Sequence, residues 1–210
     1  MKKLLVEFIG TFFLTLTVAT AAVLVGSPLA AFAIGSVLMV MIYAGGHVSG
    51  AHYNPAVSLA VFIRGRSNLQ DLISYIAVQL VAGVVAVFAA KGLVPAPATP
   101  VIAIDFPHTV PVLLAEFLFT FALAWVVLNV ATAKATTGNS NYGLAIGFTV
   151  LVGAITVGGI SLGAFNPAVT TTLLVIGKLH ASDCWMHFLP QILAATAAGY
   201  AFKATHPEDR

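Results

Sequence analysis

The tetrapeptide Asn-Pro-Ala-Val occurs twice, at residues 54–57 and 166–169, and this repetition limits what the chain can fold into. Each copy begins an apolar segment of about ten residues that stops at a basic residue, Arg64 or Lys178. Asn is a favoured helix N-cap and Pro suits the first helical position, so each copy predicts the start of a short helix. At about 1.5 Å per residue such a helix reaches about 15 Å, which is half the hydrocarbon core of a bilayer.

The composition indicates that a bilayer surrounds these short helices. Of the 210 residues, 60% are hydrophobic and 8% are charged, and the mean hydropathy is +1.01. An ordinary soluble domain carries about 25% charged residues. We therefore expect an all-α integral membrane protein rather than a soluble core protein. The net charge of +2 and the absence of a basic patch give no indication of a nucleic-acid partner.

Six apolar stretches have the length of about 20 residues that a transmembrane helix requires. The first could be a signal peptide, because two lysines precede it, but it is long enough to span and its pattern returns at 115–127. We interpret it as a transmembrane helix. The six predicted spans are residues 4–25, 29–47, 70–93, 108–132, 141–160 and 182–203.

An internal repeat relates the two halves of the chain. The offset that places Asn54 on Asn166 also places Gln79 on Gln191, and a slightly shorter offset places Glu7 on Glu116. Repeat 1 (about 1–93) and repeat 2 (about 108–205) each hold three spans and one short helix, and a Pro-rich linker (94–107) joins them. An odd number of spans inverts the second half, which predicts one domain (1–210) with an inverted 3+3 repeat.

The basic residues predict the orientation. With both termini cytoplasmic, seven basic residues lie inside and only Lys91 and Lys178 outside, as the positive-inside rule requires. We expect a multi-pass protein of the plasma or inner membrane. The seven are Lys2, Lys3, Arg64, Arg66, Lys134, Lys203 and Arg210.

The inverted repeat brings the starts of the two short helices toward each other at mid-membrane. Each helix N-terminus carries about half a positive charge, and two together repel cations and protons while offering N–H donors to a neutral guest. Irregular backbone at this depth is tolerated only where protein buries it or it lines a watery path. The pattern therefore predicts a point at mid-membrane that suits a neutral guest.

The stretches SGAHYNPAV (49–57), GAFNPAV (163–169) and EFIGTF (7–12) resemble the major intrinsic protein family of aquaporins and glycerol facilitators, over essentially the whole chain. The resemblance implies six tilted transmembrane helices and two re-entrant half-helices that meet at the pore centre. It also implies a homotetramer in the lipid bilayer with one pore per subunit. Passive passage of water and small neutral solutes, without a cofactor, is the function implied.

The resemblance assigns roles to the repeated residues. Asn54 and Asn166 are expected to donate N–H groups to a solute oxygen. Buried Glu7 and Glu116 are expected to accept hydrogen bonds from the loops before the short helices. The residues expected to hold the half-helix tips together or to support the loops are Pro55, Ala56, Pro167, Ala168, Gln79 and Gln191.

Two histidines precede the first motif. We expect His52 to fix the loop and His47 to border the cytoplasmic mouth of the pore; neither has partners at metal-ligand spacing, so no metal site is predicted. The pairs Gly45-Gly46 and Gly158-Gly159 are expected to let the backbone turn and expose carbonyls to solute.

The selectivity filter departs from the family pattern. Family members usually carry arginine after the second motif, whereas this chain has Val169, and family spacing places the rest of the filter at Ile34, Ala154 and Gly163. Such an apolar ring should be wide, so we expect ammonia, urea, glycerol or neutral metalloid hydroxides to pass beside water, while ions stay excluded. In the alternative, an aromatic residue elsewhere, such as Phe32 or Phe165, fills the space that the arginine leaves, and the channel stays narrow.

Two other kinds of membrane protein compete with a channel. Inverted repeats and broken helices also build secondary transporters, but the candidates for coupling, Glu7 and Glu116, are expected near helix starts and not beside Asn54 or Asn166. A closed-pore structural protein is the other alternative. An enzyme is not expected, because no nucleophile, base and orienting group occur together, and Cys184, the one cysteine, cannot form an internal disulfide.

Overall fold

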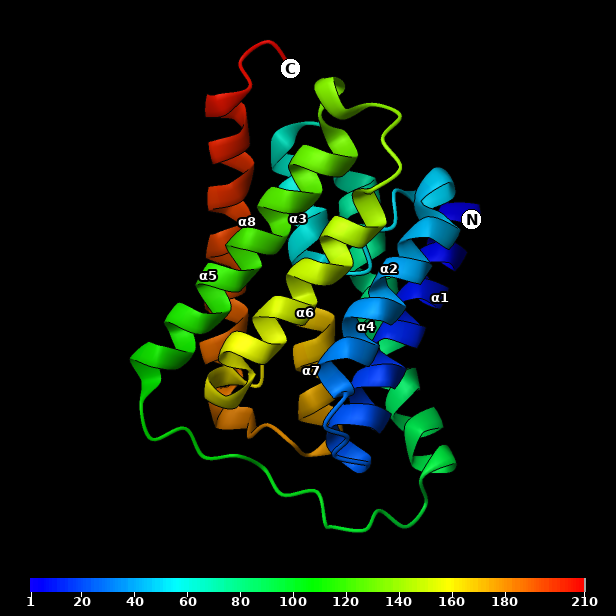
Figure 1. The fold of residues 1–210 in the computed structure, drawn as a ribbon, viewed down its shortest axis with the longest axis vertical. Coiled ribbons are helices and arrows are strands. Elements are labelled where there is room, and N and C mark those ends of the chain that lie inside the picture. Colours follow the sequence, from blue (N-terminus) through cyan, green and yellow to red (C-terminus); the bar gives the residue numbers. More distant parts are fainter. Residues whose placement is uncertain (210) are drawn as a thin grey trace.

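The computed structural model describes residues 1–209 and is a bundle of helices (Figure 1). Residue Arg210, one of the predicted cytoplasmic charges, lies outside the described residues. The helices are α1 (Lys2–Thr17, continued by the π-helical segment Val18–Leu24), α2 (Ala30–Ser49), α3 (Pro55–Arg64), α4 (Leu69–Leu93), α5 (Thr109–Val127, continued by Leu128–Thr132), α6 (Tyr142–Ser161), α7 (Pro167–Ile176) and α8 (Trp185–Thr205).

Five of these helices are long and apolar enough to cross a membrane: α1, α2, α4, α5 and α6 with their continuations. The sixth predicted span corresponds to α8, which has 21 residues but is not among the five. Its buried side includes His187, Pro190 and Gln191, so part of its polarity faces protein rather than lipid. The helix packs along α5, as α4 packs along α1.

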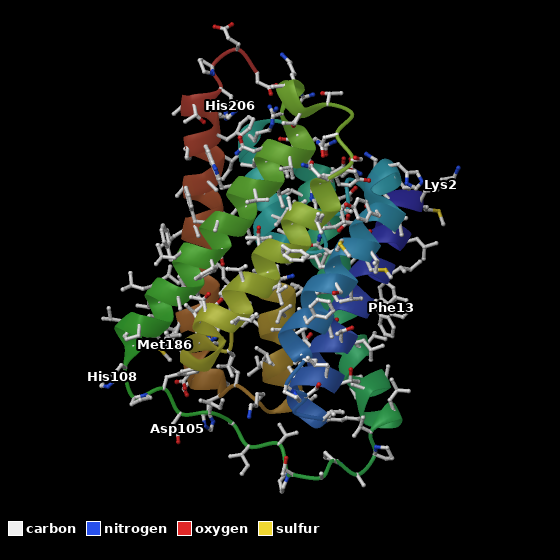
Figure 2. The ribbon with its side chains drawn as sticks, viewed as in Figure 1. Lys2, Phe13, Asp105, His108, Met186 and His206 are labelled. Carbon is white, nitrogen blue, oxygen red and sulfur yellow. The ribbon has the colours of Figure 1, made fainter. Side chains whose placement is uncertain are left out.

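The inversion of the two halves is visible in the path of the chain. Helices α3 and α7 start near the middle of the molecule and run to opposite ends (Figure 1). Lys2 and His206 lie toward one end, whereas Asp105 and His108 of the linker lie at the other (Figure 2). We name the two ends the terminal end and the linker end. The sides of the membrane to which these ends belong stay a prediction.

Helices α2 and α6 cross where glycines face each other. A Cβ atom on Gly35 would lie 2.8 Å from the Gly147 carbonyl oxygen, and one on Gly147 would lie 2.5 Å from the Gly35 carbonyl oxygen. Small residues allow such close backbone approach between membrane helices. The repeat offset that relates Asn54 to Asn166 also relates these two glycines, so the crossing joins equivalent positions of the two repeats.

Large apolar side chains cover much of the outside of the bundle. Phe13 projects away from α1 (Figure 2), and Phe32 is 58% exposed. A surface of this kind suits lipid, which has no hydrogen-bonding groups in its interior. Other exposed side chains of this group are Phe88, Val110, Leu118, Phe148, Ile155 and Tyr200.

Candidate functional site

The loops that precede α3 and α7 share one backbone conformation. In each loop three of four successive residues have a positive φ, which costs a residue with a Cβ about 1 kcal/mol or more. Every such residue of the first loop matches one of the second at the repeat offset. The angles are +88°, +50° and +49° at Gly50, Ala51 and Tyr53, and +69°, +63° and +50° at Leu162, Gly163 and Phe165.

Glu7 of α1 holds the first loop in this conformation. Its Oε1 accepts hydrogen bonds from Ser49 Oγ at 2.7 Å and from the His52 backbone N–H at 2.9 Å. Its Oε2 accepts from the Tyr53 backbone N–H at 2.7 Å and from Gln79 Nε2 at 2.9 Å. The carboxylate is fully buried, and these four donors compensate for its loss of water.

Glu116 of α5 holds the second loop in the same way. It accepts from Ser161 Oγ at 2.7 Å and from the backbone N–H groups of Ala164 at 3.0 Å and Phe165 at 2.8 Å. Gln191 Nε2 is the fourth donor, at 2.8 Å. Neither glutamate forms an ion pair within residues 1–209, so hydrogen bonds alone balance both buried charges.

Asn54 and Asn166 cap the two short helices and also cross-link the loops. The Oδ1 atoms accept from the backbone N–H groups of Ala56 and Ala168, both at 2.8 Å. Asn54 Nδ2 donates to the Phe165 carbonyl, and Asn166 Nδ2 donates to the Tyr53 carbonyl, each at 2.9 Å.

This cross-link changes the expected role of the two asparagines. An amide NH₂ carries two hydrogens, and each asparagine uses one of them for the opposite loop, which leaves one for a solute. The joining of the tips was expected from the prolines and alanines alone, and these amide bonds were not predicted. The buried residues of the first turns are Pro55, Ala56, Pro167 and Ala168.

A cavity of about 110 Å³ passes the meeting point of the short helices. About 10 to 15 Å³ of such volume holds one water molecule, so several waters fit. The wall is mostly apolar, with Asn54 and Asn166 as its amide groups. Other wall residues are Leu14, Val18, Leu38, Val57, Leu123, Val127, Ile146, Val150 and Leu173.

All four predicted filter positions, Ile34, Ala154, Gly163 and Val169, lie in this wall. Val169 is buried in an apolar cluster with Val18 and Leu173. These four positions bring aliphatic side chains and a glycine to the wall, and none of them is charged. That they form a selectivity filter stays a prediction.

The two aromatic residues that could have refilled the filter lie elsewhere. Phe32 is 58% exposed on the outside of α2. Phe165 is buried against Phe119, with ring centroids 5.4 Å apart, and is not part of the cavity wall. Neither of these two rings therefore borders the cavity, whereas Tyr53 is an aromatic residue that does.

The two histidines of the first loop region occupy different places. His52 lies in the cavity wall, and its Nδ1 is 3.0 Å from Ser58 Oγ. His47 is exposed and borders a second cavity at the terminal end, together with Arg66 and Asn139. No cluster of three His, Cys, Asp or Glu side chains suited to a metal ion occurs in residues 1–209.

The glycine pairs do not make the turns that the sequence analysis expected. Gly45 and Gly46 lie inside α2, and Gly158 and Gly159 lie inside α6. The helices continue to Ser49 and Ser161, and the turns begin at Gly50 and Leu162. The expectation that the backbone turns at these glycine pairs was therefore wrong, and the exposure of their carbonyls to solute stays a prediction.

Two supporting contacts were missed from the sequence. Tyr75 Oη donates to the Ser49 carbonyl at 2.7 Å, and His187 Nε2 lies 2.7 Å from the Ser161 carbonyl. Tyr75 and His187 are again related by the repeat offset. This offset was the one sequence signal that could have identified the two residues as equivalent. Different residue types at the two positions hid their equivalence.

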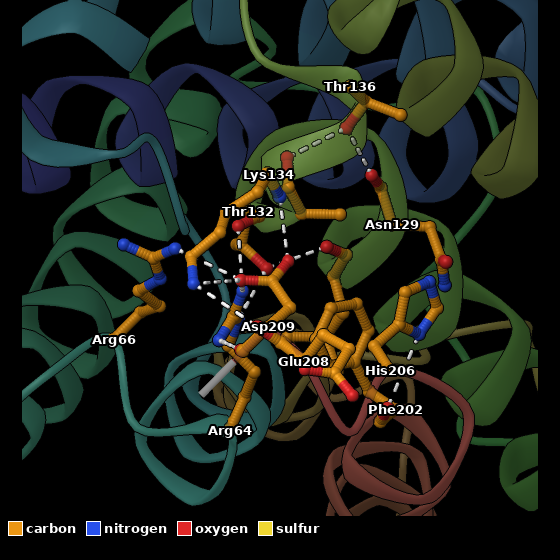
Figure 3. A network of polar contacts seen from close by, with 12 residues as sticks. Arg64, Arg66, Asn129, Thr132, Lys134, Thr136, Phe202, His206, Glu208 and Asp209 are labelled. Carbon is orange, nitrogen blue, oxygen red and sulfur yellow. Dashed lines mark hydrogen bonds and ion pairs between the residues drawn. The ribbon is translucent and has the colours of Figure 1, made fainter.

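Arg64 is buried, although the sequence analysis treated it as a cytoplasmic loop charge. Its Nη2 lies 3.0 Å from Asp209 Oδ1, and its Nε donates to Thr132 Oγ1 at 2.9 Å (Figure 3). The Lys134 backbone N–H donates to Asp209 Oδ2 at 2.6 Å. This hydrogen bond, followed by Arg64, lowers the pKa of Asp209 to about 2.

Comparison with known proteins gives one consistent family. The family model described as major intrinsic protein matches residues 1–157 and 113–209. Glycerol uptake facilitator protein-like 6 of Lactiplantibacillus plantarum is 34% identical over 218 residues, covering 100% of both chains. Aquaporin NIP1-4 of Oryza sativa subsp. japonica is 32% identical over 96% of this chain and 76% of its own length.

A solved structure shares the fold. The aquaglyceroporin from Plasmodium falciparum superposes with a TM-score of 0.74, covering 98% of this chain and 94% of its own. The two sequences are 23% identical, so this match describes the arrangement of the helices.

Proposed function

Because this chain belongs to the major intrinsic protein family and forms a membrane channel for water and small neutral solutes, we propose that the central cavity is its pore. The observation that carries this proposal is that Asn54, Asn166 and all four filter positions line one cavity. Its wall contains no carboxylate among the described residues, and its ionisable side chains are His52 and Lys178. Membership of a family of channels supports passive conduction.

The two capped helix starts would orient a solute at the pore centre. Each asparagine retains one amide hydrogen after its bond to the opposite loop, and a water or hydroxyl oxygen can accept both. The positive ends of α3 and α7 meet at this point and disfavour a cation or a proton. At the pore centre, ion and proton exclusion therefore rests on the helix ends, since the filter positions carry no charge.

Selection among neutral solutes would rest on size. The filter ring of Ile34, Ala154, Gly163 and Val169 offers no side-chain donor, so it discriminates by width rather than by hydrogen bonding. Glycerol, urea and ammonia are the solutes that we propose to pass beside water. Apolar walls suit the carbon backbone of a polyol, and the remaining amide hydrogens of Asn54 and Asn166 suit its hydroxyl oxygens.

Flux measurements on proteoliposomes test this proposal. Stopped-flow light scattering should show protein-dependent permeation of water and at least one of glycerol, urea or ammonia. A pH-sensitive dye inside the vesicles should show no protein-dependent acidification under a proton gradient. Absence of all solute and water flux would identify a closed structural protein, and stimulation of uptake by internal solute would identify a transporter.

We propose a homotetramer with both termini on the cytoplasmic side. Residues exposed on the outside of the bundle are apolar enough for lipid or for subunit contacts, and the terminal end carries most of the basic residues. Protease access to the termini in sealed spheroplasts and native mass spectrometry test the two statements separately.

A further inference from the structure

One lysine lies in the wall of the central cavity. Lys178 follows α7 and joins the cavity wall at the linker end, and apart from His52 it is the sole His, Lys, Arg, Asp or Glu of that wall among the described residues. The predicted filter positions in the same wall carry no charge. Lys178 is therefore the basic residue of the cavity at the linker end, which we call the linker mouth.

The backbone of Lys178 is fixed from both sides. Its N–H donates to the Leu173 carbonyl of α7 at 2.8 Å. Its carbonyl accepts from the Ile104 N–H of the linker at 3.1 Å, beside the bridge between Ile104 and Leu179. The base of the side chain is thus held at the rim, and only the four-carbon stem can move.

The ammonium group of Lys178 has no ion pair within residues 1–209. The acids near it in sequence have other partners: Asp105 lies 3.3 Å from His180 Nε2, and Asp183 accepts from Ser182 Oγ at 3.0 Å. The charge is therefore not neutralised by a neighbouring carboxylate.

The equivalent residue of the first repeat behaves differently. Arg66, which the repeat offset places on Lys178, borders the cavity at the terminal end. Its Nη2 lies 3.3 Å from Asp209 Oδ1. The two mouths thus carry equivalent basic residues, of which one is paired with an acid and the other is not.

We propose that Lys178 is a specificity-determining residue of the linker mouth, where its charge repels cations such as ammonium and admits neutral solutes. An uncompensated charge beside low-dielectric walls raises the potential at a cavity entrance. It would supply the positive charge that the filter ring lacks at Val169. This inference rests on the proposal that the cavity is the pore.

A thiol placed at the mouth can measure this potential without any flux. Ala22 lines the same cavity and is exposed, so an Ala22→Cys variant in a Cys184→Ser background offers one reachable thiol. The rates of its reaction with a cationic and an anionic methanethiosulfonate of similar size are compared in detergent. The rate of a neutral methanethiosulfonate serves as the reference, because it depends on how accessible the thiol is and not on the local potential.

In Lys178→Met, the ratio of the anionic to the cationic reaction rate should fall about five- to tenfold, because the positive charge is lost. In Lys178→Arg, which keeps the charge, the ratio should be unchanged. The shift should shrink at about 1 M salt, where charges are screened beyond about 3 Å. Lys91→Met is the control, because Lys91 lies at the end of α4, outside the cavity wall.

An unchanged ratio in Lys178→Met, or an equal shift in Lys91→Met, would overturn the proposal. If Lys178 only stabilised the end of α7, Lys178→Met would have a lower melting temperature, and its ratio of anionic to cationic rates would not depend on salt. Water flux through the unmodified protein is an independent measurement. Its absence would overturn the proposal that the cavity is a pore, but it would not change what the thiol rates say about the charge at the mouth.

Discussion

At the scale of single residues, the account depends on two buried carboxylates. Glu7 and Glu116 each accept four hydrogen bonds and hold loop residues with positive φ. The family resemblance implied that both are buried acceptors, and their repetition inside apolar stretches agreed with it. It could not show which loop atoms they bind, since that depends on the left-handed residues Ala51 and Phe165, whose types give no sign of this conformation.

Glu116→Gln tests this support. The amide offers one acceptor oxygen and two unwanted donors to the N–H groups of Ala164 and Phe165, so we expect a loss of about 2 kcal/mol or more in stability. Water flux should fall with it. Thermal unfolding in detergent and stopped-flow scattering measure the two effects. The exposed Glu208→Gln is the matched control, and equal melting temperatures for both variants would contradict the assigned role.

The Asp209 carboxylate gives a prediction on pH. Its pKa is lowered from 3.8 to about 2 by the Lys134 N–H and by Arg64, so its contribution to stability is present above about pH 4 and is lost as pH falls toward 2. Asp209→Asn should therefore be less stable than the native protein at pH 7, and the difference should shrink near pH 2. Melting temperatures measured at several pH values check this, and a difference independent of pH would refute it.

At the scale of elements, close helix crossings set the geometry of the bundle. The helix bounds follow the predicted apolar stretches closely, because length and hydropathy determine a membrane span. The sequence missed the π-helical continuation of α1 at Val18–Leu24, and it misread Gly45-Gly46 and Gly158-Gly159 as turns. Glycine is compatible with both a turn and a helix in lipid, so composition alone does not decide.

Gly147→Ala tests the crossing of α2 and α6. Its Cβ would lie 2.5 Å from the Gly35 carbonyl oxygen, so the helices must separate, and we expect a loss of about 1 to 3 kcal/mol. Gly159→Ala in the same helix meets nothing within 4 Å and should be tolerated in stability and flux. A loss of flux in Gly159→Ala with normal stability would restore the role that the sequence analysis gave to this glycine pair.

At the scale of the whole molecule, the inverted repeat explains why so much was predictable. A single offset relates the capping asparagines, the loop angles, the supporting glutamines and the crossing glycines. The pairs whose residue type differs were missed, such as Tyr75 with His187. The contact of Arg64 with Asp209 was also missed, because Asp209 follows the second repeat and has no counterpart in the first.

The central claim is that the cavity conducts and that its apolar ring, with Val169 in it, sets the size limit. The most direct test compares the native protein and Val169→Arg by stopped-flow scattering in proteoliposomes with water, glycerol and urea. Arginine would occupy the ring and add donors, so we predict that glycerol and urea permeability falls about tenfold or more while water permeability is retained. Unchanged glycerol and urea permeability at equal protein incorporation would contradict the claim.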